Sequence, residues 1–177
     1  MGMDIKNLED MIRNLNSDGM GGKRDLLPLY ANGEALKALI SYLAEPYRGK
    51  VDLVCSPEPL GFIIGSMLAR ELGVGLVVIR RNHQFWIDPE EQVTASYINH
   101  RDKVTSLITE RKILPVGSSV LLADDWMSTA ATMQACTNLI EDAGCKVVGM
   151  AAVGADYQSG TKGLIDSGSA RIVYCEK

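Results

Sequence analysis

The chain has 177 residues, a formal net charge of -4 and 46% hydrophobic residues. This length suits one domain with a full core, and the apolar content is that of a globular protein, not of a disordered or fibrous one. The acidic balance, with no basic stripe, argues against nucleic acid as the main partner. No apolar run is long enough to span a bilayer, and residues 1–16 lack the apolar segment of a signal peptide, so we expect no membrane association and a cytoplasmic location.

The N-terminal part of the sequence predicts two helices. Apolar residues at helical spacing begin at Ile5 and end at Leu15, before a polar and glycine-rich break over residues 16–22. The second helix is expected to start after Asn32, a good N-cap, and to end near Ala44, before Pro46.

From residue 51 onward, short β-rich runs alternate with helical segments. Residues 81–92 are polar and are expected to form a long mobile loop. The alternation predicts an α/β fold whose mostly parallel central sheet is flanked by helices, with ligands bound beyond the carboxyl ends of the strands. The expected strands are 51–55, 76–79, 120–123, 147–153 and 172–175, and the expected helices are 61–72, 132–143 and 159–166. Residues 104–110 could form a strand or a helix, and the strand is favoured.

The four cysteines are expected to be inert. They are widely spaced and form no C-x-x-C pair, so no zinc site is predicted. Three of them lie in apolar strand or helix patterns, where a free thiol packs as a small hydrophobic group.

The turn after the strand 120–123 carries the most informative chemistry. Two carboxylates, Asp124 and Asp125, follow the apolar run directly, and a loop of small and hydroxyl residues leads into a helix. A helix N-terminus with free backbone N–H groups binds anions, and adjacent carboxylates suit ribose hydroxyls, directly or through Mg²⁺. The loop residues are Ser128, Thr129, Ala130, Ala131 and Thr132.

This segment resembles the 5-phosphoribosyl-1-pyrophosphate (PRPP) motif of the type I phosphoribosyltransferases, in which four apolar residues and two acids precede T-G-x-T. Asp124 and Asp125 match the acids, and Thr129 and Thr132 match the threonines. The likeness covers nearly the whole chain and is closest to the adenine and xanthine phosphoribosyltransferases. Further matching segments are residues 24–29 (R-D-L-L-P-L), 61–62 (G-F), 72–74 (L-G-V), 79–81 (I-R-R) and 95–97 (A-S-Y).

The resemblance implies a single domain over residues 1–177, with a hood at 1–30 and a mobile loop at 81–99. It implies transfer of the 5-phosphoribosyl group from PRPP to a purine-type base with release of pyrophosphate, in a cytoplasmic homodimer that needs Mg²⁺. Asp124 and Asp125 would be the catalytic and metal-binding pair. The PRPP site would also include 128–132, Arg80 and Arg81; the base site Arg24, Asp25, Leu26 and Trp126; and the pyrophosphate loop Glu58, Pro59, Leu60 and Gly61.

The sequence departs from the family pattern at positions that matter for turnover. Ala130 stands where the family usually has Gly, and Leu60 where it has an Arg that neutralises pyrophosphate. The loop after Arg81 lacks the usual Lys, and His100-Arg101 replaces a common Glu-Tyr pair. An alternative is therefore a non-catalytic PRPP- or nucleotide-binding regulator of the same fold.

Several residues also have simpler interpretations. The two acids could cap the following helix, and Glu58 could be a solvated turn residue. Trp126 could contact the base or ribose, or be buried under the helix. His83 and His100 could be surface residues or contribute a usable imidazole. The Phe85-Trp86 pair could form a lid over the base or bind a partner chain.

Overall fold

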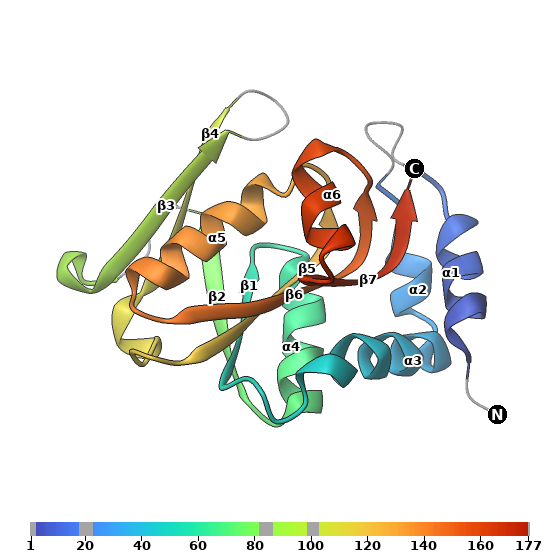
Figure 1. The fold of residues 1–177 in the computed structure, drawn as a ribbon, viewed down its shortest axis with the longest axis horizontal. Coiled ribbons are helices and arrows are strands. Elements are labelled where there is room, and N and C mark those ends of the chain that lie inside the picture. Colours follow the sequence, from blue (N-terminus) through green and yellow to red (C-terminus); the bar gives the residue numbers. More distant parts are fainter. Residues whose placement is uncertain (1–2, 18–22, 82–86, 99–102, 177) are drawn as a thin grey trace.

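The structure, a computed structural model, describes residues 3–17, 23–81, 87–98 and 103–176 (Figure 1). Within these ranges, seven strands form one sheet in the order β3-β4-β2-β1-β5-β6-β7. Each of β2, β1, β5, β6 and β7 is parallel to its neighbours in that set, whereas β4 is antiparallel to both β2 and β3. The strands are β1 (Leu53–Pro57), β2 (Gly75–Arg81), β3 (Gln92–Ile98), β4 (Val104–Glu110), β5 (Ser119–Met127), β6 (Lys146–Asp156) and β7 (Ala170–Glu176).

Helices cover both faces of this sheet (Figure 1). Helices α1 to α4 pack on one face, and α5 with α6 on the other. No helix in the described part of the chain is long and apolar enough to cross a membrane. The helices are α1 (Ile5–Arg13), α2 (Leu27–Tyr30), α3 (Gly33–Ala44), α4 (Gly61–Leu72), α5 (Ala131–Asp142) and α6 (Ser159–Asp166), with short 3₁₀ turns η1 (Glu45–Tyr47), η2 (Pro89–Glu91) and η3 (Arg111–Ile113).

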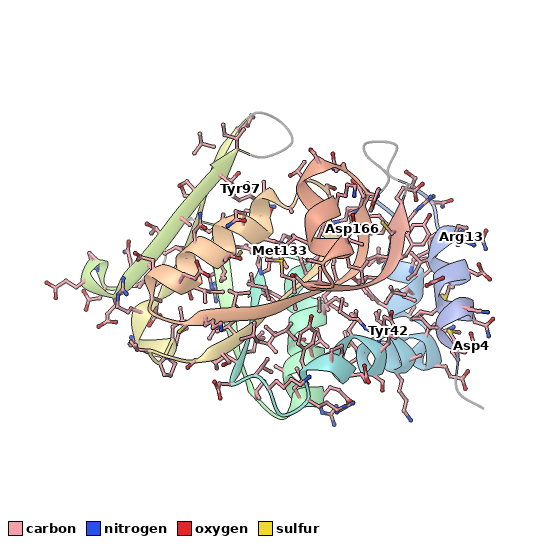
Figure 2. The ribbon with its side chains drawn as sticks, viewed as in Figure 1. Asp4, Arg13, Tyr42, Tyr97, Met133 and Asp166 are labelled. Carbon is pink, nitrogen blue, oxygen red and sulfur yellow. The ribbon has the colours of Figure 1, made fainter. Side chains whose placement is uncertain are left out.

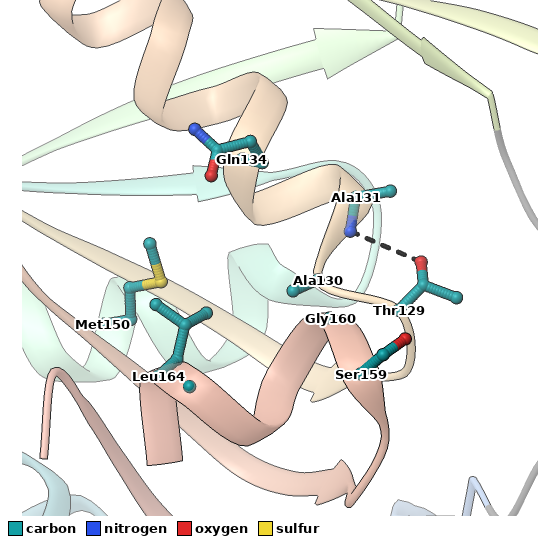
Figure 3. Close-up of a pocket in the computed structure, with 9 residues that line it drawn as sticks. Thr129, Ala130, Ala131, Gln134, Met150, Ser159, Gly160 and Leu164 are labelled. Carbon is teal, nitrogen blue, oxygen red and sulfur yellow. Dashed lines mark hydrogen bonds between the residues drawn. The ribbon is translucent and has the colours of Figure 1, made fainter. Parts of the chain in front are cut away.

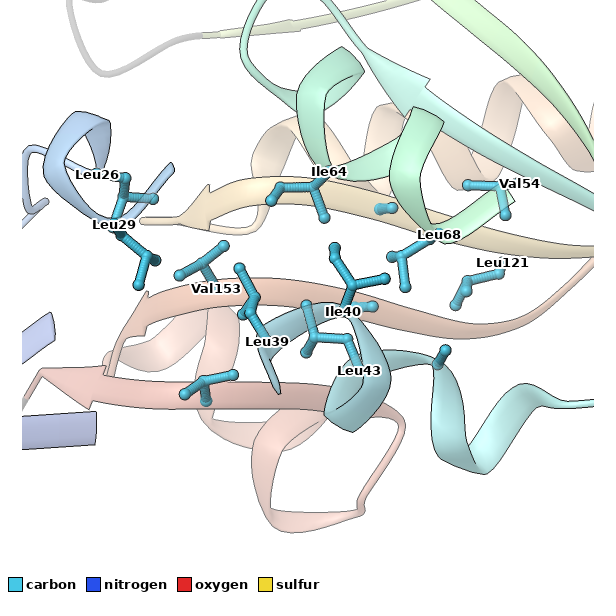
Figure 4. Packing of buried hydrophobic residues seen from close by; sticks show 14 of the residues in the cluster. Leu26, Leu29, Leu39, Ile40, Leu43, Val54, Ile64, Leu68, Leu121 and Val153 are labelled. Carbon is cyan, nitrogen blue, oxygen red and sulfur yellow. The ribbon is translucent and has the colours of Figure 1, made fainter. Parts of the chain in front are cut away.

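The core consists of two apolar layers, one on each face of the sheet. Strand β5 contributes to both, because side chains alternate along a strand: Leu121 and Ala123 face α3 and α4, whereas Val120 and Leu122 face α5. Figure 4 shows the first layer, where side chains from α2, α3 and α4 interdigitate over the sheet. A strand covered on both faces explains the uninterrupted apolar run in the sequence.

The helix ends follow the local sequence signals. Asp4 caps α1 by accepting the N–H of Asn7, and Arg13 lies in the last turn of the same helix (Figure 2). The Asn32 side chain caps α3 as predicted, by accepting two backbone N–H groups. Gly73 ends α4 in the left-handed region at φ 72°, a conformation that favours glycine.

The segment expected to be a loop over residues 81–99 contains a strand. Residues 92–98 form β3, which pairs in antiparallel register with β4 from Gln92↔Glu110 to Ile98↔Val104. The loop interpretation is therefore wrong for these residues, because the pairing satisfies their backbone groups although much of the strand is exposed. The strand predicted at 104–110 is confirmed.

Candidate active site

Strand β5 carries both predicted acids. Its parallel pairing with β6 continues through Asp124↔Ala152 to Met127↔Ala155, so the acids lie within the end of the strand. The sequence analysis ended this strand at Ala123, where the apolar run stops. Backbone pairing does not require apolar side chains, and it fixes the two carboxylates at the carboxyl edge of the sheet.

Asp124 lies against the start of helix α4. A Cβ atom added to Gly61 would lie 3.0 Å from Asp124 Oδ1, so any larger residue there would have to displace the carboxylate or the start of the helix. The same oxygen accepts the N–H of Asp125 at 2.8 Å. Burial, reinforced by the charge of Asp125, raises the pKa of Asp124 well above its ordinary value, although that N–H and Lys23 oppose the shift.

Asp125 is buried and forms an ion pair with Lys23. The two atoms, Asp125 Oδ2 and Lys23 Nζ, are 2.6 Å apart, and the side chains are 7% and 33% exposed. The contact lacks the geometry of a directed hydrogen bond, so among the described residues Oδ2 has an ionic partner but no hydrogen-bond donor. The N-terminal segment is thereby attached to the end of β5.

Tyr30, the last residue of α2, places a second polar group near the acids. Its hydroxyl is buried and has no hydrogen-bond partner among the described residues. Burial raises the pKa of this phenol, and the charges of Asp125 and Asp124 raise it further. It is therefore a proton donor without an acceptor.

The loop after the acids turns sharply into α5. Ala130 has φ 60°, the one non-glycine residue with positive φ in the described part of the chain. The Thr129 hydroxyl accepts the N–H of Ala131 at 3.3 Å (Figure 3), and Gln158 donates to the Ser128 carbonyl. Ala130 thus adopts the left-handed conformation that glycine adopts without strain.

Helix α6 supports this loop from behind. A Cβ atom on Gly160 would lie 2.1 Å from the Thr129 carbonyl oxygen, so the start of α6 packs directly on the loop backbone. Beside this contact is a cavity of about 400 Å³ between α5 and α6, to which the acids do not contribute (Figure 3). It is lined by Thr129, Ala130, Ala131, Gln134, Met150, Ser159, Gly160, Gly163 and Leu164.

The segment from Glu58 to Gly61 joins β1 to α4 beside the acids. It contains a cis Glu58–Pro59 peptide bond. The Glu58 carboxylate accepts the N–H of Arg81 at 2.9 Å, which places the segment beside the end of β2, and Leu60 is 38% exposed. The structure thus brings the predicted pyrophosphate loop to both Asp124 and the Arg80–Arg81 pair.

The described residues contain no group of three or more His, Cys, Asp or Glu side chains that could hold a metal ion. The adjacent acids alone fit the way in which proteins bind Mg²⁺, through one or two carboxylates together with substrate oxygens and water.

Residues 9–166 match the phosphoribosyl transferase domain family. The chain belongs to this family. It is 39% identical to the adenine phosphoribosyltransferase of Lactobacillus acidophilus over 129 residues (72% of this chain, 71% of the relative) and 36% identical to that of Brevibacillus brevis over 150 residues (84% and 85%). A crystal structure of adenine phosphoribosyltransferase from Thermoanaerobacter pseudethanolicus superposes with a TM-score of 0.83 at 24% identity, covering 97% of this chain and 99% of that one.

The matches confirm three sequence-based predictions: the family, the fold class and PRPP-dependent transfer to a purine-type base. This phosphoribosyltransferase domain also has the acids, the loop and the Glu58–Gly61 segment at one edge of the sheet, as the motif predicted. The assignment of individual residues to PRPP, base and metal stays a prediction.

Each of the four residues predicted to bind the base has contacts within the protein, and their role toward the base stays a prediction. Trp126 is 5% exposed, packs against Tyr174 and donates its indole N–H to Asp156 at 2.9 Å, so its side chain is buried, in the core layer of α1 to α4 rather than under α5. Arg24 forms an ion pair with Glu176 at 2.6 Å, and Leu26 is buried in the core. Asp25 accepts the N–H of Leu27 at the start of α2 and is exposed.

Lys23 and Tyr30 are the site residues that the sequence analysis missed. They flank the matching segment 24–29 on either side, and neither matches a family motif letter. Their approach to the acids depends on contacts between residues about a hundred positions apart. The predictions for His83, Phe85, Trp86, His100 and Arg101 fall outside the described residues.

Proposed function

We propose that this chain transfers the 5-phosphoribosyl group from PRPP to adenine, with release of pyrophosphate. The observation that carries the proposal is the acid pair at the end of β5, followed by the left-handed turn at Ala130 and the start of α5. Adenine is favoured over other purine-type bases because the relatives at 39% and 36% identity are named adenine phosphoribosyltransferases.

The loop 128–132 would bind the 5-phosphate of PRPP. The first N–H groups of α5 have no partner within the helix and point toward its N-terminal end, where the helix dipole favours an anion. Ser128, Thr129 and Thr132 would add hydroxyl donors. Thr129 is exposed, and Ser128 and Thr132 are partly exposed, so a phosphate can reach all three.

Asp124 and Asp125 would hold the ribose hydroxyls while the bond from C1 to pyrophosphate breaks. Positive charge develops on the sugar ring in this step, and an anion held close to it stabilises the transition state. Mg²⁺ bound to PRPP would neutralise pyrophosphate, with Asp124 or Asp125 as the protein ligand. Arg80 and Arg81, at the end of β2, would supply positive charge beside Leu60, which carries none.

Pyrophosphate release tests the activity. The protein is incubated with PRPP, Mg²⁺ and each of adenine, guanine, hypoxanthine and xanthine, and release is expected with adenine. Asp124→Asn combined with Asp125→Asn should lower kcat/KM for PRPP by about a hundredfold or more, because two groups near the developing charge are neutralised. Asp142→Asn, an exposed change at the far end of α5, is the matched control.

Two results would contradict this proposal. Unchanged turnover in the double variant would show that the acids are not the site. Tight PRPP binding by calorimetry without turnover on any base would favour the alternative, a non-catalytic regulator that keeps the PRPP site.

A homodimer and a cytoplasmic location are part of the same proposal. Both are implied by the resemblance to the type I enzymes. Light scattering coupled to gel filtration measures the dimer, and a monomer at micromolar concentration would contradict it.

A further inference from the structure

Lys23 places a positive charge in the innermost part of the predicted site. It precedes helix α2, and its ammonium lies 2.6 Å from a carboxylate whose side chain is only 7% exposed. A carboxylate buried to this extent needs a partner, because removal of one member of a buried ion pair leaves an uncompensated charge. The ion pair of Lys112 with Glu110 is a contrast, since that lysine is 64% exposed.

Two buried polar atoms of this region lack hydrogen-bond partners among the described residues: the Tyr30 hydroxyl and Asp125 Oδ2, the oxygen that pairs with Lys23. Buried polar groups in folded proteins are normally hydrogen-bonded, so each of these atoms has capacity for a polar ligand. A sugar hydroxyl, which donates and accepts at once, has the required chemistry.

The charges around the acids create a difficulty for a polyanionic substrate. Asp124, Asp125 and Glu58 all lie at this edge of the sheet, and Leu60 provides no positive charge. PRPP carries a phosphate and a pyrophosphate, which carboxylates repel in a partly dry site. The ammonium of Lys23, which is paired with Asp125, reduces the repulsion between these carboxylates and PRPP.

We propose that Lys23 is a positioning residue of the PRPP site, whose ammonium neutralises and orients Asp125 so that the acid pair can accept a polyanionic sugar pyrophosphate. This inference rests on the proposed function. It adds a charged residue of the N-terminal segment to a site whose other predicted charged groups come from β2, β5 and the segment after β1. Lys23 acts through Asp125, with which its ammonium is paired at 2.6 Å.

Two substitutions at position 23 separate charge from structure. Lys23→Met keeps the length of the apolar stem and removes the charge, whereas Lys23→Arg keeps the charge. Lys112→Met is the matched control, because it removes one lysine from an exposed ion pair. Thermal unfolding followed by circular dichroism establishes that each variant is folded.

The readouts are the Kd for PRPP by calorimetry at fixed Mg²⁺ and the KM values for PRPP and adenine. Lys23→Met should raise the Kd and KM for PRPP about tenfold or more, because it leaves a buried carboxylate unpaired beside the substrate. The KM for adenine should stay unchanged, and Lys23→Arg should keep the Kd within about threefold of the wild-type value. A purely structural role would not give this split between the two substrates.

The possible outcomes distinguish the two proposals. Unchanged or tighter PRPP binding in Lys23→Met, with normal wild-type turnover, would overturn the role of Lys23 and leave the proposed function intact. Equal losses for PRPP and adenine, or no rescue by Lys23→Arg, would also overturn it. A wild-type protein that binds no PRPP would refute the proposed function and this inference together.

Discussion

The turn after β5 and the segment before α2 both resemble the family, but the sequence predicted them unequally well. The turn 124–132 is a continuous piece of chain whose two acids, hydroxyl residues and helix start can be recognised from their order in the sequence. In residues 23–30, two charged side chains are paired with distant residues: Lys23 with Asp125 and Arg24 with Glu176. A motif in one continuous segment is therefore predicted better than a contact between distant segments.

Replacement of Trp126 should have the largest effect on stability. Trp126→Ala is expected to lower the free energy of unfolding by about 3–5 kcal/mol, because it leaves a cavity in the core and deprives Asp156 of its indole donor. Urea unfolding monitored by circular dichroism measures the change. If Trp126 instead faced the base, the variant would keep its stability and lose adenine affinity, which would restore the original assignment.

Neutralising the buried acid should stabilise the protein while weakening PRPP binding. Burial raises the pKa of Asp124, so the folded state holds its proton more tightly than the unfolded state does. This group therefore lowers stability as the pH rises above its unfolded pKa of about 3.9. Asp124→Asn should increase the free energy of unfolding by about 1–3 kcal/mol at pH 8 and by less at pH 5.

Denaturant unfolding at the two pH values checks the effect on Asp124. Asp142→Asn, which changes an exposed carboxylate, is the control and should show no such pH dependence. An equal increase in the free energy of unfolding at both pH values would mean that burial does not raise the pKa of Asp124.

The smallest expected effect comes from the left-handed residue of the loop. Ala130→Gly should raise the free energy of unfolding by about 1 kcal/mol, because glycine adopts φ 60° without the steric cost that alanine has there. The matched change Ala131→Gly, at the first helical position, should have the opposite sign, because glycine loses more backbone entropy in a helix. Equal signs for the two variants would indicate that the turn relaxes in solution.

The fold was largely predictable because its signals are local. Asn32 and Gly73 mark helix ends by their own hydrogen bonding and backbone conformation, and Leu121 with Leu122 marks a strand buried on both faces. Strand β3 was missed because its partner β4 defines it, and its exposed residues include the polar Thr94 and Ser96. Helix α2 has only four residues, which is too short for any periodic pattern.

Only the part of the candidate site that lies in one continuous motif could be predicted from the sequence. Asp124, Asp125 and residues 128–132 were identified from their order alone. Trp126 was assigned to the base because it follows the acids, but its direction is decided by Asp156 and Tyr174 on neighbouring strands. Lys23 carries no local signal, since a lysine before Arg24 is indistinguishable in the sequence from a surface cation.

The contact between Gly160 and the Thr129 carbonyl ties helix α6 to the turn after β5. A methyl group at position 160 would displace the backbone of this turn, from a helix that itself contributes no acid or base to the candidate site. Removal of the C-terminal helix and strand would therefore disturb the turn, even though these elements begin some thirty residues beyond the acids. The backbone conformation of the turn therefore depends on glycine at position 160.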